Sequence, residues 1–403
     1  MQPSIPAGSP LHGIRVIDLS SVMFGPYASQ YLGDFGAEVI KVEAPAGDST
    51  RRTGPAAEAD LASCFIGLNR NKRSVVLDLK QAAGRAALQR LLAGADVLMH
   101  NIRPQKLAAL GLGAEQLRER YPRLVCASLN GFGEGGPYAG QPAYDDIIQG
   151  MSGLVDLVQR QTGESRYLPT AAADKIAGLV AAQAILAALL GRAQSGQGGT
   201  VEVPMFEVLS SFNLVEHLGG ATFTPARGGT GYARVLSGDR RPYRTHDGHL
   251  CVMPYTDQHW ARFFAEVGRA ELAADPRFAD MDARTRHIDE LYGLLAEFLA
   301  QRSTAEWLAA CARIDIPAAR VNSLDDLLVD PHLNAVGLFQ ACPAGAGQGR
   351  VRLAASGVRF DGEQRTFSAP PRLGEHTREV LASNGFSAEE IDGLLASGAA
   401  RQA

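Results

Sequence analysis

Short β-rich runs alternate with helical segments over the first half of the chain, and this alternation restricts the fold more than any other feature of the sequence. Strands are predicted at Ile14–Leu19, Glu38–Glu43, Ser74–Leu79, Asp96–Met99, Leu124–Leu129 and Thr200–Val203, with helices such as Tyr27–Phe35 and Gln81–Ala93 between them. The pattern is typical of an α/β fold with a Rossmann-like, doubly wound parallel sheet. Ligands of such sheets bind beyond the carboxyl ends of the strands, so functional residues are expected in the loops that follow them.

A chain of 403 residues is long for one core and typical of two domains. The composition changes to Gly, Thr, Pro and Arg at 222–231, and a β-hairpin with Asp247-Gly248 at its turn is predicted beyond it. We expect a large α/β domain at 1–225, completed by about 335–403, and a smaller α+β domain at 226–330. The linkers are expected at about 215–232 and 325–345.

Composition excludes several classes of function. The net charge of −4 gives no electrostatic argument for nucleic acid or an anionic membrane as a partner. Five scattered cysteines favour a reducing compartment over a disulfide framework or a zinc site. No signal peptide is visible, and the apolar run around 179–190 is too short to span a membrane. We expect a cytoplasmic protein without a metal site, although His246 and His249 beside the hairpin turn leave a two-histidine site as an alternative.

Asp174 opens an otherwise apolar segment, in which it and Lys175 are the only ionisable residues from Ala171 to Leu190. A helix this apolar is normally buried, and the carboxylate at its start lies beside the positive helix end. Small neighbours allow another molecule to approach. The setting suits a nucleophilic carboxylate that is partly desolvated yet kept ionised. A helix N-cap is the alternative interpretation, because Asp is a favoured capping residue.

Two other motifs are open to more than one interpretation. The segment Gly131–Gly136 matches the G-x-G-x-x-G pattern after a strand, but Pro137 and a loop follow it instead of a helix. Nicotinamide binding is therefore not favoured. The segment Asn69–Arg73 carries three cations before the third strand, which form either a solvated loop or a phosphate site. Lys80 follows the carboxyl end of that strand.

Several longer motifs follow one another in order along the chain. They are Leu11–Leu19, Gly33–Glu43, Asn71–Lys80, Asn101–Pro104, Tyr144–Gly153, the Asp174 helix, Gly199–Glu207 and Pro371–Thr377. Together they resemble the class III coenzyme A transferases, a family that includes formyl-CoA and carnitine CoA transferases. The resemblance extends over essentially the whole chain.

The resemblance implies that Asp174 is the catalytic nucleophile. We expect Tyr144 and Asp145 to shape the pocket by hydrogen bonding near Asp174. The resemblance implies CoA contacts at Val22, Met23, Phe24, Arg73, Leu77, Lys80 and Asn101. It also implies an interlocked homodimer with the active site where large and small domains meet. CoA or acyl-CoA is then a substrate, with a carboxylic acid as the second substrate, and no cofactor is bound permanently.

The chain departs from the family pattern at three positions. Ala44 and Ala109 stand where formyl-CoA transferase has arginines near CoA, and Pro142 stands in place of a lysine. Arg103 and Arg73 are expected to compensate for these missing cations.

Two alternatives to transfer are a catalytically silent acyl-CoA-binding protein and an α-methylacyl-CoA racemase. In racemases of this fold a histidine precedes an aspartate, whereas this chain has Tyr144-Asp145. Tyrosine, with an ordinary pKa near about 10, is a poor proton relay at neutral pH, so transfer is favoured. Arg234, Arg240, Arg241 and Arg244 suggest a small dicarboxylic acid as acceptor. The segment Gly228–Gly231 is expected to be a mobile lid or a plain linker.

Overall fold

The computed structural model describes residues 8–343 and 349–403 of the chain. The chain divides into two compact units. The large unit comprises the chain up to 152, 168–211 and 334–403, and the small unit comprises 153–167 and 212–333. The small unit thus begins earlier than the composition change suggested, and it includes a segment that we placed in the large domain. The expected linker at 325–345 contains helices α15 (Leu324–Val329) and α16 (Pro331–Ala335), and its residues 344 and 345 lie outside the described part.

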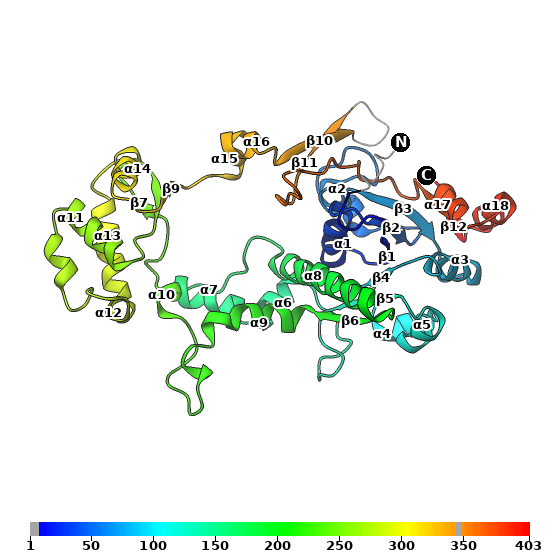
Figure 1. Ribbon diagram of the computed structural model, residues 1–403, viewed down its shortest axis with the longest axis horizontal. Helices are drawn as coiled ribbons and strands as arrows, with labels where there is room; N and C mark the ends of the chain where they lie inside the picture. Colours follow the sequence, from blue (N-terminus) through cyan, green and yellow to red (C-terminus); the bar gives the residue numbers. More distant parts are fainter. Residues whose placement is uncertain (1–7, 344–348) are drawn as a thin grey trace. The chain divides into compact units, whose positions relative to one another are not determined.

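A seven-stranded sheet forms the centre of the large unit (Figure 1), in the order β12-β3-β2-β1-β4-β5-β6. Its strands are β1 (Arg15–Asp18), β2 (Glu38–Glu43), β3 (Lys72–Leu77), β4 (Val97–His100), β5 (Val125–Asn130), β6 (Gly199–Pro204) and β12 (Ala400–Arg401). All neighbouring pairs are parallel except β12 and β3. The order 3-2-1-4-5-6 is that of the doubly wound dinucleotide-binding folds, so the predicted fold class is confirmed.

Helices cover both faces of this sheet. They are α1 (Phe24–Asp34), α2 (Ser63–Leu68), α3 (Ala82–Leu92), α4 (Pro104–Ala109), α5 (Ala114–Arg120), α6 (Asp145–Met151), α8 (Ala172–Ser195), α17 (Thr377–Ser383) and α18 (Ala388–Ala396). On one face, strand residues such as Ile17, Ile40 and Val75 pack against α3, α5, α17 and α18. A two-stranded hairpin, β10 (Phe339–Pro343) and β11 (Arg350–Ala354), lies apart from the main sheet.

The strand positions that alternate with this apolar core carry charges. Asp18, Lys41, Glu43 and Lys72 are buried, and with Asp48 they form what we call the buried charge cluster. Lys41 Nζ lies 3.0 Å from Asp48 Oδ2, and Lys72 Nζ lies 3.5 Å from Asp18 Oδ2. Successive side chains of a strand point to opposite faces, which is why charges and apolar residues can alternate inside one buried strand.

Helix α8 packs against α1 and beside β5 and β6. Gly178 permits this approach, because a Cβ atom there would lie 3.0 Å from the Phe24 carbonyl oxygen. By length and composition alone, α8 is apolar enough to cross a membrane. The expectation that no apolar segment reaches that length is therefore corrected: the helix extends over 24 residues, with Asp174 and Lys175 in its first turn.

The small unit contains a three-stranded sheet, β7-β8-β9, and a helical layer. Helix α9 (Met205–His217) begins in the large unit and enters the small unit at Phe212. The other elements of the small unit include α7 (Leu154–Thr162), α10 (Ala233–Leu236), β7 (Tyr243–Arg244), β8 (His249–Val252), α11 (Asp257–Glu266), α12 (Met281–Arg286), α13 (Ile288–Leu299), α14 (Thr304–Arg313) and β9 (Ala318–Arg320). Strands β7 and β8 pair as an antiparallel hairpin around Asp247-Gly248, as predicted. Trp260, Phe263 and Trp307 are buried at its core.

Candidate active site

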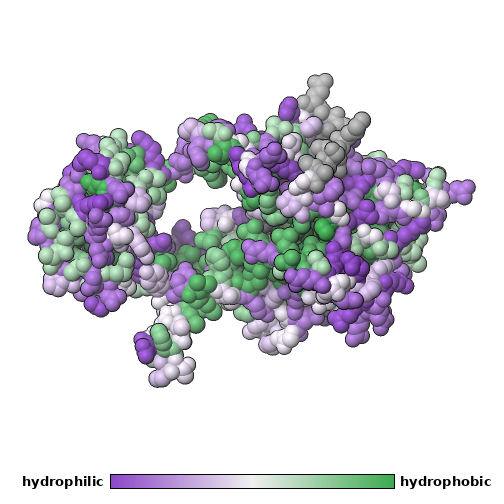
Figure 2. Space-filling model, viewed as in Figure 1, coloured by the Kyte–Doolittle hydropathy of each residue, from purple (hydrophilic) through white to green (hydrophobic). Residues whose placement is uncertain are grey.

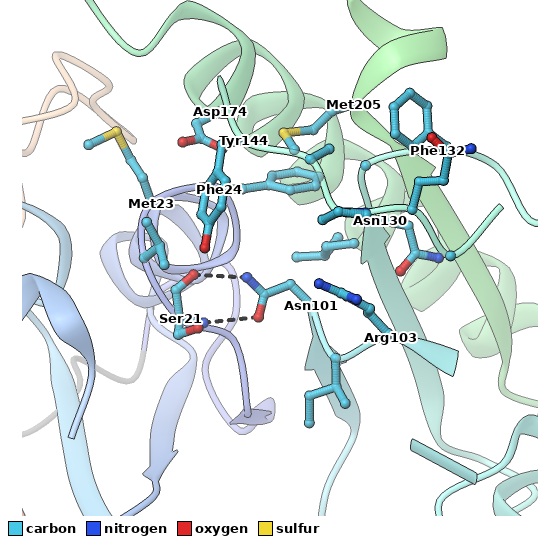
Figure 3. A pocket seen from close by; sticks show the side chains of 18 of the residues that line it. Ser21, Met23, Phe24, Asn101, Arg103, Asn130, Phe132, Tyr144, Asp174 and Met205 are labelled. Carbon is cyan, nitrogen blue, oxygen red and sulfur yellow. Dashed lines mark hydrogen bonds between the residues drawn. The ribbon is translucent and has the colours of Figure 1, made fainter. Parts of the chain in front are cut away.

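A pocket of about 430 Å³ opens in the large unit at the carboxyl edge of the sheet. Loops after β1, β4 and β5 line it, together with the start of α8 (Figure 3). Strand order reverses between β1 and β4, and such a switch point is where doubly wound sheets bind their ligands. Seven of the residues that the sequence singled out line the pocket: Val22, Met23, Phe24, Asn101, Arg103, Tyr144 and Asp174.

The loops after β1 and β4 are joined by one side-chain amide. Asn101 Oδ1 accepts from the Ser21 N–H at 3.1 Å, and Asn101 Nδ2 donates to the Ser21 carbonyl at 2.9 Å (Figure 3). The next residue, Val22, has φ +70°, which is rare for a β-branched residue and costs conformational energy. Its N–H points at both carboxylate oxygens of Asp48, at 3.2 Å each. Asp48, a member of the buried charge cluster, therefore holds the Val22 backbone in the pocket wall.

Asp174 is the third residue of α8 and not its N-cap. The capping position is occupied by Ala171, and the Asp174 N–H donates to Asp145 Oδ1 at 3.0 Å. The N-cap interpretation of Asp174 is therefore wrong, because Asp145 on another helix takes the capping role. Within residues 8–343 and 349–403, the carboxylate of Asp174 itself has no hydrogen-bond or ion-pair partner.

The electrostatic setting of Asp174 also differs from our expectation. Burial, and then the negative charge of Asp145, raise the pKa of Asp174 to about 7. We expected the positive helix end to keep this carboxylate ionised. Burial and the neighbouring carboxylate instead both favour the protonated form of Asp174.

Gln149, which the sequence analysis did not identify, holds this arrangement together. Its side chain is fully buried and donates to Asp145 Oδ2 at 2.5 Å and to the Thr170 carbonyl at 3.1 Å. Its Oε1 accepts from the Leu168 N–H at 2.9 Å. Gln149 thus ties α6 to the segment that leads into α8. The sequence did show that Gln149 follows Asp145 by one helical turn within the motif Tyr144–Gly153, and this spacing could have identified it.

The glycine-rich stretch after β5 is not a phosphate cradle. The Gly133 N–H donates to Glu207 Oε1 at 2.9 Å, and the Glu134 N–H donates to Glu202 Oε1 at 2.7 Å. These amides, which a phosphate would require, already bind carboxylates of β6 and α9. The structure thus gives a physical reason why the dinucleotide pattern carries no dinucleotide function here.

The cations of 69–73 pair with carboxylates of the fold. Arg70 pairs with Asp34 at 2.6 Å, and Lys72 is buried in the charge cluster. Arg73 contacts Glu38 at 2.7 Å and Glu379 at 2.8 Å, near the amino end of β3 and away from the pocket.

The other two CoA contacts implied on this strand also lie outside the pocket wall. Leu77 is buried in the apolar core, and Lys80 is exposed beyond the carboxyl end of β3.

The family profile of CoA-transferase family III matches residues 11–377. The chain belongs to this family. The transferase is 34% identical over 384 residues to a succinate–glutarate CoA-transferase of Agrobacterium fabrum, covering 93% of this chain and 95% of that one. It is 32% identical over 394 residues to the beta subunit of a succinyl-CoA–L-malate CoA-transferase of Chloroflexus aurantiacus, covering 96% of each. A crystal structure of Rv3272 from Mycobacterium tuberculosis matches with a TM-score of 0.79 at 30% identity, covering 93% of this chain and 99% of that one.

The small-unit arginines of the transferase differ in their surroundings. Arg234 donates to the Tyr292 hydroxyl at 2.9 Å and lies over the Tyr255 ring. Arg240 and Arg241 line a largely apolar cleft of about 530 Å³ within the small unit, and Arg241 also pairs with Asp239. Arg244 is exposed at the end of β7.

The glycine-rich segment 228–231 of the transferase is hydrogen-bonded within the small unit. The Gly231 N–H donates to the His217 carbonyl at 2.8 Å, and Gly229 accepts from the Gly220 N–H at 2.9 Å. Arg160 donates to the Thr230 carbonyl at 3.2 Å. In the part of the chain that the structure describes, no group of three or more His, Cys, Asp or Glu is placed to hold a metal ion.

Proposed function

We propose that the transferase moves CoA from an acyl-CoA donor to a small free dicarboxylic acid, with Asp174 as the nucleophile. The observation that carries this proposal is the Asp174 carboxylate, which lines a pocket at the sheet's switch point and lacks a hydrogen-bonding partner among the described residues. A carboxylate that served only the structure would be expected to be paired, as those of the buried charge cluster are.

The reaction proceeds in four balanced steps. Ionised Asp174 attacks the thioester carbonyl, and the CoA thiolate leaves with the formation of an aspartyl–acyl anhydride. The thiolate attacks the aspartyl carbonyl, which gives an aspartyl–CoA thioester and releases the donor acid. The acceptor carboxylate attacks the aspartyl carbonyl of that thioester, which forms an aspartyl–acceptor anhydride and releases the CoA thiolate. The thiolate then attacks the acceptor's acyl carbonyl, and the Asp174 carboxylate leaves. The products are a new acyl-CoA and free Asp174, and each step exchanges one activated acyl bond for another.

The surrounding residues have distinct roles in this proposal. Asp145 and Gln149 are positioning residues, because together they fix the start of α8. After burial, the charge of Asp145 also raises the pKa of the nucleophile. Tyr144 lines the pocket with 69% of its surface exposed, and it is free to contact the acyl group. No histidine is found among the described residues that line the pocket, whereas a racemase needs a second base.

The acceptor class is supported by two of the relatives named above. One is a succinate–glutarate CoA-transferase and the other a subunit of a succinyl-CoA–L-malate CoA-transferase, and succinate, glutarate and malate are all dicarboxylates.

We also propose the interlocked homodimer that the family resemblance implies. Large apolar side chains are exposed along α8 and α9, including Leu190 at 65% and Val215 at 82%. Figure 2 shows hydrophobic residues gathered over α8. Exposed apolar surface of this kind marks an association site. The Chloroflexus relative is named a beta subunit, so a paired assembly of two different chains is the contrasting arrangement.

Mass spectrometry of the trapped enzyme tests the proposed function. The protein is incubated with succinyl-CoA and a mixture of short mono- and dicarboxylic acids, and intact and peptide masses are recorded. We expect a CoA-sized adduct on the peptide containing Asp174, its absence in Asp174→Asn, and a new dicarboxylyl-CoA. Exchange of the α-hydrogen of a 2-methylacyl-CoA with deuterated solvent, without any adduct, would instead identify a racemase. Binding of acyl-CoA with neither reaction would identify a silent binder.

A further inference from the structure

The loop that follows β1 is held by two members of the buried charge cluster. Lys41 Nζ donates to the Ser20 carbonyl at 2.9 Å, and Asp48 accepts from the Val22 N–H with each carboxylate oxygen 3.2 Å away. The two side chains also pair with each other at 3.0 Å, and both are buried, so water does not compete for these contacts. A buried ion pair therefore holds the backbone of the pocket wall.

Val22 has a backbone conformation that is unfavourable for its side chain. Its φ of +70° lies in the left-handed region, where the Cβ atom of a branched residue crowds the backbone. Glycine adopts the same φ without this cost, because it has no Cβ atom. Such a conformation persists only where surrounding contacts outweigh its cost. The bond from the Val22 N–H to Asp48 is a contact of this kind, and a bond to a carboxylate is stronger than one between neutral groups.

Asp48 is itself fixed by residues away from the pocket. Its Oδ1 accepts from the Thr50 N–H at 3.0 Å and from the Thr50 hydroxyl at 2.8 Å, and these contacts cap the short 3-10 helix Ser49–Arg52. The Asp48 N–H donates to Glu43 Oε2 at 3.1 Å. A carboxylate held on several sides cannot follow the loop if Val22 changes its conformation, so Asp48 resists such a change.

The residues that follow Val22 lie close to the helix that carries Asp174. Met23 and Phe24 line the same pocket as Asp174 (Figure 3). One helical turn after Asp174, Gly178 packs against the start of α1, where its Cβ atom would lie 3.0 Å from the Phe24 carbonyl oxygen. A change of φ at Val22 would turn the chain that enters α1 and displace this wall relative to Asp174. A misplacement of about 1 Å at a reacting centre can lower a rate by about a hundredfold.

From these observations we infer that Asp48 is a positioning residue for the transfer reaction: it holds Val22 in its left-handed conformation and thereby sets the place of the pocket wall relative to Asp174. The inference rests on the proposed function, since it takes Asp174 as the nucleophile. Asp48 is buried and is not among the described residues that line the pocket, so it acts through the Val22 backbone and not on the substrate. A purely structural Asp48 would have the same effect whichever residue stands at position 22.

A double-mutant cycle separates this role from a structural one. Asp48→Asn is introduced into wild type, Val22→Gly and Val22→Ala, and the formation of the CoA adduct on Asp174 is timed by mass spectrometry at saturating succinyl-CoA. We expect Asp48→Asn to slow adduct formation by about tenfold in wild type and in Val22→Ala. In Val22→Gly the loss should be under about twofold, because glycine keeps the positive φ without the bond to Asp48.

Two further variants keep the test independent of folding. Asp34→Asn breaks the buried ion pair with Arg70 outside the pocket, so it should lower stability toward urea without slowing adduct formation. Asp48→Glu keeps a negative charge beside Lys41 while it displaces the carboxylate from Val22. It takes the place of Asp48→Asn in the cycle if that protein does not fold, with the same expected rescue by Val22→Gly.

The outcomes allow the inference to fail by itself. An equal loss of rate in the Val22→Gly background would overturn it, because Asp48 would then act on the fold and not through Val22. Adduct formation at the wild-type rate in Asp48→Asn would also overturn it. Both results would leave Asp174 as the nucleophile, since the adduct still forms there. The absence of an adduct in wild type would overturn the proposed function, and this inference with it.

Discussion

The pocket wall and the buried charge cluster both contain carboxylates, but those of the cluster are paired with cations and Asp174 in the pocket is not. In the cluster, Asp18 accepts from the Ser20 N–H at 2.8 Å and from the Ser29 hydroxyl at 2.5 Å, with Lys72 nearby. Burial alone would raise the pKa of Asp18, but the charges of Lys72 and Lys41 and the two serine hydrogen bonds together hold that pKa below its ordinary value. In the pocket, Asp174 has a raised pKa and no such partner. Pairing thus separates carboxylates that hold the fold from the one available for chemistry.

The largest expected effect concerns the unpaired carboxylate. Asp174→Asn is expected to lower the transfer rate by at least about a thousandfold, because an amide cannot form the anhydride. Its free energy of unfolding should not fall, because the substitution removes a buried charge that no group compensates. Steady-state kinetics and urea unfolding measure the two quantities, with Asp146→Asn on α6 as the control. Activity within tenfold of wild type would contradict the role of Asp174.

The opposite pattern is expected for the paired carboxylate. Asp18→Asn removes the buried carboxylate that pairs with Lys72, so the free energy of unfolding should fall by about 3–5 kcal/mol. Asp282→Asn, an exposed residue of α12, serves as a control expected to change little. Urea unfolding at neutral pH measures both. A change of under about 1 kcal/mol for Asp18→Asn would show that pairing does not distinguish the two regions.

The two regions should also respond oppositely to pH. The transfer rate should rise with pH through about 7, because Asp174 attacks only when ionised. The folded pKa of Asp174 lies above its unfolded value of 3.8, so the folded state binds the extra proton between these values. The Asp174 contribution to stability is therefore lost as pH rises from about 4 to about 7.

For Asp18, whose folded pKa is lowered, the contribution is present above about 3.8 and lost on acidification. Urea unfolding across pH, compared between wild type and Asp174→Asn, isolates the first slope. A pH-rate profile that is flat between pH 5 and 8 would refute the assignment of Asp174 as the titrating nucleophile.

The smallest expected effect concerns Asp145, whose negative charge is the second cause, after burial, of the raised pKa of Asp174. Asp145→Asn removes the negative charge beside Asp174 while an amide oxygen can still accept from the α8 N–H. The acid limb of the pH-rate profile should move to lower pH, without the large rate loss of Asp174→Asn. A limb that stays in place would mean that burial alone sets the pKa. Gln149→Glu is the converse variant, because it adds a negative charge beside Asp145.

The sequence predicted the strands to within a few residues, because short apolar runs separated by helices leave few alternatives. It also predicted that functional residues would lie beyond the carboxyl ends of the strands, which is where the pocket opens. Val22 and the CoA role of Asn101 came from the family resemblance and not from the strand pattern. The sequence did not predict that Arg73 is ion-paired, because one of its partners is Glu379, about 300 residues further along the chain. Local sequence shows a charge but not whether a distant residue neutralises it.

The electrostatics of Asp174 illustrate the same limit more closely. The position of Asp174 at a helix start was visible, but Asp145 lies 29 residues earlier and reaches the helix through a tertiary contact. Burial raises the pKa of Asp174, and the charge of Asp145 raises it further, so the carboxylate is not kept ionised as expected. Gln149 was missed for a related reason, since a buried glutamine in a helix differs from an exposed one only by the surfaces it joins.

The return of the chain to the large unit after the small unit constrains how this protein can be synthesised. The edge strand β3 is covered by β12 and by residues around Gly374, whose N–H donates to Ser74 Oγ at 2.9 Å. These residues leave the ribosome only after the whole small unit has been made. Until then the nascent chain presents an open sheet edge, which favours association with other chains. The small unit can therefore finish folding first, and chains interrupted before Ala400 are expected to depend on chaperones.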